Sequence, residues 1–122
     1  RGMTDQLTMG QTAANTRYEF IEGDVELAPG VTLIYTPGHT VGHYSLLVEF
    51  DNRRPLLLTL DAACTRKNYD HDINAGFHID PVAGVNSMRR LKEIEKAKNA
   101  EVLFSHDPES FKDYKTGVNF YG

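Results

Sequence analysis

The sequence predicts a layered α/β domain. Short segments rich in β-branched and apolar residues alternate with turn residues over the first half of the chain, and one long helical segment follows them. A last apolar segment comes after that helix, and strands that alternate with a helix form a sheet with the helix on its face. The run Leu56–Leu60 is almost continuously apolar, which is typical of a strand covered on both faces rather than of an open hairpin.

The length and composition exclude several classes of protein. The 122 residues suffice for one domain with one core. A net charge of −4 at pH 7 provides no basic surface for nucleic acid or an anionic membrane, and no apolar run is long enough to cross a bilayer. Cys64 is the only cysteine, so the fold does not depend on an oxidising compartment, and we expect a cytoplasmic protein. The chain opens Arg1-Gly2-Met3, which leaves an upstream targeting segment open.

The strands are predicted from the N-terminus onward. Residues 1–17 are polar and without periodicity, so they are predicted to be a linker. Val31–Tyr35 is the clearest strand, because it follows the turn residues Pro29-Gly30 and is rich in β-branched and aromatic side chains. The other segments predicted as strands before the helix are Tyr18–Ile21, Asp24–Leu27, Tyr44–Phe50 and Pro55–Leu60.

One helix is predicted from Asp80 to about Asn99. The Asp80 carboxylate suits the N-cap, and Pro81 suits the first helical position because the N–H that it lacks would go unpaired there. Apolar residues recur at every third position, which spreads them around the helix, and the charged residues over 89–98 fit a solvated side. The last strand is predicted at Glu101–Phe104.

Three side chains of types that bind metals each follow a predicted strand. They are His39, Asp61 and His106, and loops at the carboxyl ends of strands are where sites collect in layered sheets. Two imidazoles and one carboxylate suit Zn²⁺, which binds nitrogen and oxygen well. A histidine after a strand is also commonly a hydrogen-bonded structural residue, and an aspartate there is commonly a turn former. The residues by themselves therefore leave a metal site and three separate structural roles both open.

The sequence around these residues resembles a known superfamily. Thr36–Leu46 reads TPGHTVGHYSL and is similar to the TPGHTxGHxSL signature of metallo-β-lactamase hydrolases. Leu58–Ala63 and Phe104–Asp107 resemble the next two metal motifs of that superfamily, in the same order. Ala75–Arg90 and Tyr114–Gly122 are similar to the narrower N-acyl homoserine lactonase family, in the branch that contains 4-pyridoxolactonase and γ-butyrolactone hydrolases.

This resemblance implies a fold, a cofactor and metal ligands. The family's fold is an αββα sandwich, and residues 18–122 resemble its C-terminal αβ half. The resemblance implies two zinc ions per intact active site, with His39 binding one ion, His106 binding the other, and Asp61 bridging them. In the family a metal-bound hydroxide attacks the lactone carbonyl, in line with the ability of zinc to acidify its water.

The resemblance also suggests roles for residues around the metals. Phe77 and His78 are expected to bind substrate, although an aromatic residue before a helix is as often part of the core. Asp61 and Cys64 are the expected catalytic residues, and Cys64 stands where the lactonases usually carry a tyrosine. For Cys64 an extra soft metal ligand and a small buried residue are both alternatives, of which the small buried residue is favoured. His43 belongs to the motif and is expected to make a structural hydrogen bond.

The expected function is the opening of a small lactone, as in quorum quenching, by a longer protein. The family's first motif, His-x-His-x-Asp-His, does not occur in the 122 residues, so the N-terminal half that carries it is the expected partner. The 122-residue chain alone is therefore expected to be inactive. Two alternatives stay open: an inactive fragment that serves as an interaction module, and a thioester hydrolase similar to glyoxalase II. A second copy of the chain, in a homodimer, is among the expected partners.

Overall fold

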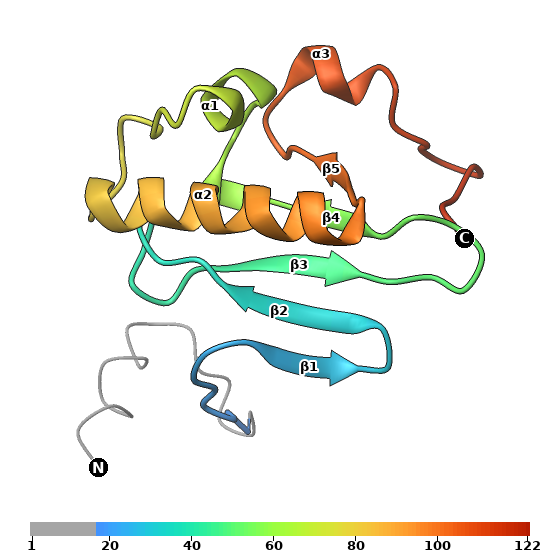
Figure 1. Ribbon diagram of the computed structural model, residues 1–122, viewed down its shortest axis with the longest axis horizontal. Helices are drawn as coiled ribbons and strands as arrows, with labels where there is room; N and C mark the ends of the chain where they lie inside the picture. The colour runs from blue at the N-terminus through green and yellow to red at the C-terminus, as the bar shows by residue number, and fades with distance from the viewer. Residues whose placement is uncertain (1–16) are drawn as a thin grey trace.

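Five strands form one mixed sheet in the order in which they occur in the chain (Figure 1). The computed structural model describes residues 17–122. The first four strands pair with their neighbours in antiparallel fashion, and the fifth lies parallel to the fourth. The strands are β1 (Val25–Ala28), β2 (Val31–Tyr35), β3 (Tyr44–Val48), β4 (Leu56–Leu58) and β5 (Glu101–Leu103).

One long helix, α2 (Pro81–Lys98), lies in the crossover between the parallel strands β4 and β5. The Asp80 carboxylate accepts a hydrogen bond from the backbone N–H of Ala83 at 2.9 Å, and Pro81 is the first helical residue, as predicted. Asn99 ends the helix in the left-handed conformation, with φ 51°. The shorter elements are the 3₁₀ turn η2 (Leu60–Ala62), α1 (Arg66–Asp70) and α3 (Pro108–Phe111).

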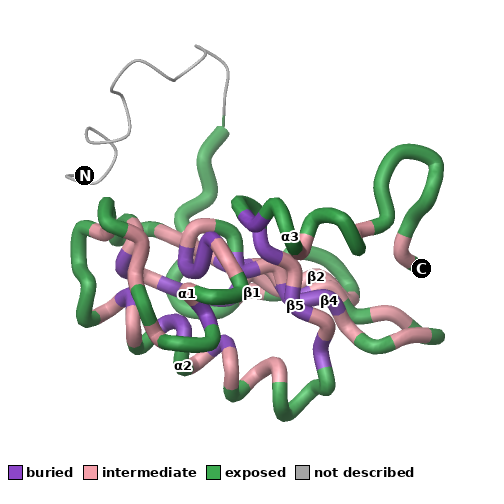
Figure 2. The backbone as a smooth tube through the Cα atoms, turned by 90° about the horizontal axis from the view of Figure 1, so that it is seen from above, coloured by how far each residue is buried: buried purple, intermediate pink, exposed green. Residues whose placement is uncertain are grey.

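The core lies between α2 and one face of the sheet. Met88 and Leu91 of α2 are fully buried, and Val85 and Ile94 pack against the core from the flanks of the helix. This explains the spacing of every third residue, because the two middle positions of such a series face the sheet and the outer two turn aside. Figure 2 shows the helix with buried and half-buried positions alternating with exposed ones. The sheet residues in the core cluster are Ile34, Leu47, Leu57 and Val102.

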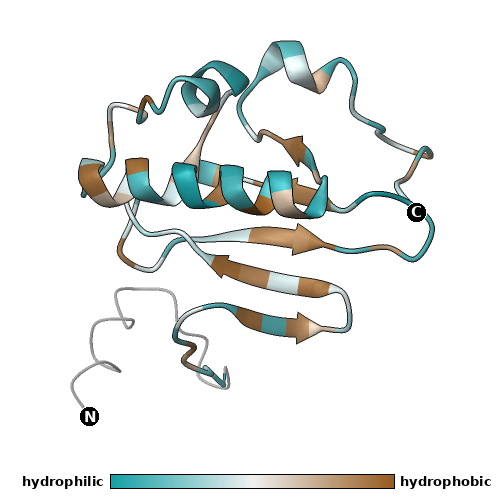
Figure 3. Cartoon of the chain, viewed as in Figure 1, coloured by the Kyte–Doolittle hydropathy of each residue, from teal (hydrophilic) through white to brown (hydrophobic). Residues whose placement is uncertain are grey.

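The opposite face of the sheet carries a row of leucines. Leu33 pairs with Leu46, Leu46 with Leu58, and Leu58 with Leu103, so one leucine from each of four neighbouring strands lies in register. All four are partly exposed, on the face that α2 does not cover. Figure 3 shows that strands β2 and β3 are rich in hydrophobic residues, although one face of each strand is not covered by the helix. A sheet with an apolar face needs a further layer to bury it.

Several predicted elements differ from the structure. The predicted strand Tyr18–Ile21 is wrong, because these residues have no regular structure and mostly lie exposed beyond the edge strand β1. The strand predicted to reach Leu60 ends at Leu58, because Leu60 takes a left-handed φ of 50° and begins η2. Helices α1 and α3 were not predicted. The predicted linker falls, except for Arg17, outside the described residues.

Helices α1 and α3 are short, and the longer α2 is rich in charged residues. None of those within residues 17–122 is long and apolar enough to span a membrane.

Candidate metal centre

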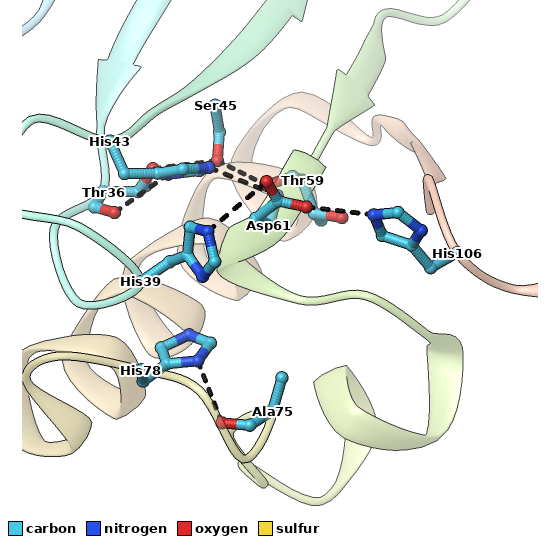
Figure 4. A network of polar contacts seen from close by, with 9 residues as sticks. All are labelled: Thr36, His39, His43, Ser45, Thr59, Asp61, Ala75, His78 and His106. Atoms are coloured by element: carbon cyan, nitrogen blue, oxygen red, sulfur yellow. Dashed lines mark hydrogen bonds and ion pairs between the residues drawn. The ribbon is translucent and has the colours of Figure 1, made fainter.

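Three predicted ligands meet at one edge of the sheet (Figure 4). His39 follows β2, Asp61 lies in η2 just after β4, and His106 follows β5. One carboxylate oxygen of Asp61 lies 3.1 Å from Nε2 of His106, and the other lies 3.6 Å from Nε2 of His39. The predicted convergence of these side chains is therefore confirmed, while their binding of a metal stays a prediction.

The three side chains form an open site with metal-ligand chemistry. The exposed fractions are 22% for His39, 39% for Asp61 and 63% for His106, so a small molecule can reach the carboxylate. Nδ1 of His39 is buried and has no hydrogen-bond partner among the described residues. Two imidazoles on either side of one carboxylate fit Zn²⁺ in donor type, with the carboxylate in a position to serve two ions.

A buried polar network holds Asp61 in place. The backbone N–H of Asp61 donates to Nε2 of His43 at 3.2 Å, so this nitrogen must be unprotonated. The proton therefore sits on Nδ1, which donates to the carbonyl oxygen of Thr36 at 3.1 Å. Burial lowers the pKa of His43, which favours this neutral form. The structural hydrogen bond predicted for His43 is confirmed, and it joins the motif to the backbone of Asp61.

Sequence reasoning missed the rest of this network. The Thr36 hydroxyl lies 2.9 Å from Nδ1 of His43 and 3.0 Å from the Ser45 hydroxyl, which donates to the carbonyl oxygen of Thr59 at 3.0 Å. The three hydroxyl residues are fully buried. A signal was available for two of them, because Thr36 and Ser45 belong to the TPGHTVGHYSL segment.

The His39 loop is fixed by contact with the start of α2. A Cβ on Gly38, whose φ is 140°, would lie 2.4 Å from Cα of Gly84, so only glycine permits this approach. The Ser87 hydroxyl donates to the carbonyl oxygen of Pro37 at 2.6 Å, and this adds a second link between helix and loop. The position of His39 thus depends on small residues of α2.

Phe77 and His78 lie beside His39. Their ring centroids are 5.3 Å and 5.5 Å from the His39 ring, both in edge-on arrangements. Phe77 is 63% exposed, which argues against the alternative that it is a core residue. Nδ1 of His78 lies 3.1 Å from the carbonyl oxygen of Ala75, and burial lowers the pKa of His78. Both residues border the site, and their binding of substrate stays a prediction.

Cys64 is buried next to Asp61 and His106. It is 8% exposed, in agreement with the favoured small buried residue. Its sulfur is also close to Asp61 and His106: the sulfur, a carboxylate oxygen and a ring nitrogen all lie within 4.8 Å of one another. Burial, followed by the nearby Asp61 charge, raises the pKa of the Cys64 thiol. Its catalytic role stays a prediction.

Similar proteins of known activity match this chain. No protein-family model matches it. The N-acyl homoserine lactonase of Bacillus sp is 46% identical over 96 residues, which are 78% of this chain and 38% of that protein. The 1.4 Å structure of an N-acyl homoserine lactone hydrolase, with the product N-hexanoyl-L-homoserine bound at its catalytic metal center, is 41% identical with a TM-score of 0.74. That match covers 80% of this chain and 38% of the hydrolase.

A second solved structure agrees in fold. The quorum-quenching N-acyl homoserine lactone lactonase is 38% identical with a TM-score of 0.79, over 85% of this chain and 43% of that protein. The chain thus spans well under half the length of the relatives that it matches. Its mixed α/β fold corresponds to part of the metallo-β-lactamase fold of these lactonases. Over most of its own length the chain is a homologue of the N-acyl homoserine lactonases, metal-dependent hydrolases of which it matches one part.

Proposed function

We propose that this chain is the C-terminal half of a zinc-dependent lactonase that opens N-acyl homoserine lactones or related small lactones. The observation that carries the proposal is the Asp61 carboxylate, which directs one oxygen to each of two imidazoles in the loops after β2 and β5. The homology to lactonases, one of which holds its ring-opened product at a metal center, supports a lactone as the substrate.

The residues of this chain have separate tasks in the proposed site. His39 and His106 would each hold one zinc ion, and Asp61 would bridge the two. Zinc held in this position would act as a Lewis acid and would lower the pKa of coordinated water. The edge formed by Phe77 and His78 beside His39 would orient the ring of the lactone, because both side chains border the site.

The proposed active protein is longer than this chain. Three ligands shared between two ions leave each ion short of the four that zinc usually takes. The leucine row on the open face of the sheet also requires a second layer. Both needs would be met by an N-terminal half with a His-x-His-x-Asp-His motif, and the 122-residue chain alone is proposed to be inactive.

Kinetics of the protein at its full encoded length test this function. The zinc-loaded protein is expected to open N-hexanoyl-homoserine lactone and γ-butyrolactone. Asp61→Ala and His106→Ala are expected to lower kcat/KM by about a hundredfold or more, because each removes a metal ligand. His71→Ala is the matched control, because His71 is exposed at the end of α1 and should leave kcat/KM unchanged.

Two results would reject the proposal. Hydrolysis of thioesters but not of lactones would assign the protein to the glyoxalase II-like alternative. Equal activity of Asp61→Ala and His71→Ala would show that the carboxylate between the imidazoles has no part in the reaction.

A further inference from the structure

Cys64, Asp61 and His106 form a compact set of three different donor atoms. Because the thiol sulfur, a carboxylate oxygen and an imidazole nitrogen lie within 4.8 Å of one another, one point exists within roughly 2.8 Å of all three. Zinc takes ligands at about 2.0–2.3 Å, so closing the set around an ion requires each atom to move by about 0.5–0.8 Å. Oxygen, nitrogen and sulfur together are a donor set that suits zinc.

The backbone fixes the two loops that carry these donors. The backbone N–H of His106 donates to the carbonyl oxygen of Cys64 at 3.1 Å, which ties one loop to the other. On the far side of Cys64, the Asp107 carboxylate accepts a hydrogen bond from the backbone N–H of Arg66 at 2.9 Å. The loop that carries Asp61 and Cys64 has an internal hydrogen bond, because the Thr59 hydroxyl donates to the carbonyl oxygen of Ala63 at 2.7 Å. Donors held by such links are positioned before any ion arrives.

His39 stands apart from this set. Its Nε2 faces the second carboxylate oxygen of Asp61, at 3.6 Å, whereas His106 faces the first. The two metal positions are therefore unequal within this chain. The position at His106 has three donors from residues 61–106, and the position at His39 has His39 and a shared carboxylate.

We propose that Asp61, Cys64 and His106 together bind one zinc ion within this chain, with Cys64 as a thiolate ligand. The inference rests on the proposed function only in placing the ion at the lactonase site, and it adds a ligand and an order of loading. The ion at His106 binds first and needs no residue from another half. The ion at His39 binds only when further ligands are supplied.

Titration of the 122-residue chain with Co²⁺ tests the proposal, because cobalt replaces zinc and reveals its ligands by absorption. We expect saturation at one cobalt per chain, with a thiolate-to-cobalt charge-transfer band in the near ultraviolet. Because Cys64 is the only cysteine, this band identifies its sulfur even without a variant. Cys64→Ser is expected to abolish the band and to weaken cobalt binding by about tenfold or more, because a serine hydroxyl is a poor replacement for one of the three ligands.

Two further variants make the readout specific. His71→Ala, the matched control, and His39→Ala are both expected to keep the band and the stoichiometry, whereas His106→Ala should weaken binding as Cys64→Ser does. Absence of the band in the unmodified chain, or its loss in His39→Ala, would overturn the assignment. Lactone hydrolysis by the longer protein without a thiolate band would remove Cys64 from the metal and leave the proposed function standing. A thiolate band without any lactone hydrolysis would keep Cys64 as a metal ligand and reject the proposed function.

Discussion

At the scale of single residues, the position of Asp61 depends on a neutral histidine behind it. His43 accepts the Asp61 backbone N–H through Nε2 and donates through Nδ1, so both of its nitrogens are used. The two roles require a ring with nitrogens on opposite sides, which explains why an imidazole occupies this place. The hydrogen bond from His43 to Asp61 is made at the Asp61 backbone, so His43 positions the carboxylate through the backbone.

We predict that His43→Ala lowers the free energy of unfolding by about 1–3 kcal/mol, because it leaves a partly buried N–H of Asp61 and a carbonyl of the buried Thr36 without their present partner. Urea denaturation of the metal-free chain measures this change. The exposed His71 provides the control, since His71→Ala should change stability by less than about 0.5 kcal/mol. Equal midpoints for the two variants would contradict a supporting role for His43.

The residues of the site were predictable to different degrees. His39, Asp61 and His106 could be placed together because each follows a strand, and strand ends at one edge of a sheet converge. The closeness of Cys64 to His106 could not be predicted from spacing. It depends on the parallel pairing of β4 with β5, which brings together residues 42 positions apart in the chain.

At the scale of elements, the same two-residue signal starts two helices. Asp80-Pro81 begins α2 and was recognised, whereas Asp107-Pro108 begins α3 and was missed. The Asp107 carboxylate accepts hydrogen bonds from the backbone N–H groups of Glu109 and Ser110, as an N-cap does. The short α3 has no apolar periodicity to support the signal. Capping residues therefore marked both helices, but periodicity could identify only the long one.

The limits of strand prediction have a different cause. Tyr18–Ile21 has the composition of a strand but no partner in the sheet, and isolated strands gain no ladder hydrogen bonds. The apolar run extends to Leu60, but β4 ends at Leu58. Leu60 cannot continue the strand because its φ is positive, and the chain turns there toward the site. Composition alone does not show where the pairing of β4 with its neighbours stops. The loop that carries Asp61 begins at that point.

The connection between α1 and α2 depends on charge and therefore on pH. Asp72 accepts hydrogen bonds from Lys92 at 2.8 Å and from Arg89 at 3.0 Å, both on α2. These bonds, with Lys92 the stronger cause, hold the pKa of Asp72 below its ordinary value. The ionised carboxylate therefore stabilises the fold above the unfolded-state pKa of about 3.9, and this contribution is lost as the pH falls through the lower folded-state pKa.

We predict that Asp72→Asn lowers the free energy of unfolding by about 0.5–1 kcal/mol at neutral pH and by progressively less below about pH 4. Asparagine tolerates the left-handed φ of 54° at this position, so the substitution removes charge without adding backbone strain. Urea denaturation of both proteins across this pH range gives the difference directly. A difference that stays constant with pH would show that the ion pairs add no stability.

At the scale of the whole molecule, the chain has one covered and one uncovered sheet face. α2 buries Ile34, Leu47 and Leu57, while the leucine row lies on the other side, half exposed. The sequence predicted a strand covered on both faces at β4, and this holds at Leu56 and Leu57, which are both buried. It could not show what covers the leucine row, because apolar side chains indicate that a covering layer is needed but do not identify that layer.

The uncovered face gives the last prediction, which concerns association of the chain on its own. Leu46 stands in the row between Leu33 and Leu58, so we expect the 122-residue chain to self-associate through this face. Leu46→Lys should weaken association by about tenfold or more, since an unpaired charge would enter an apolar contact. Val118→Lys is the control, because Val118 is 93% exposed and is not part of the row. Sedimentation at several concentrations measures both, with circular dichroism to verify the fold of each variant. If the unmodified chain is monomeric at every concentration, the leucine row is stable when exposed to solvent and needs no covering layer.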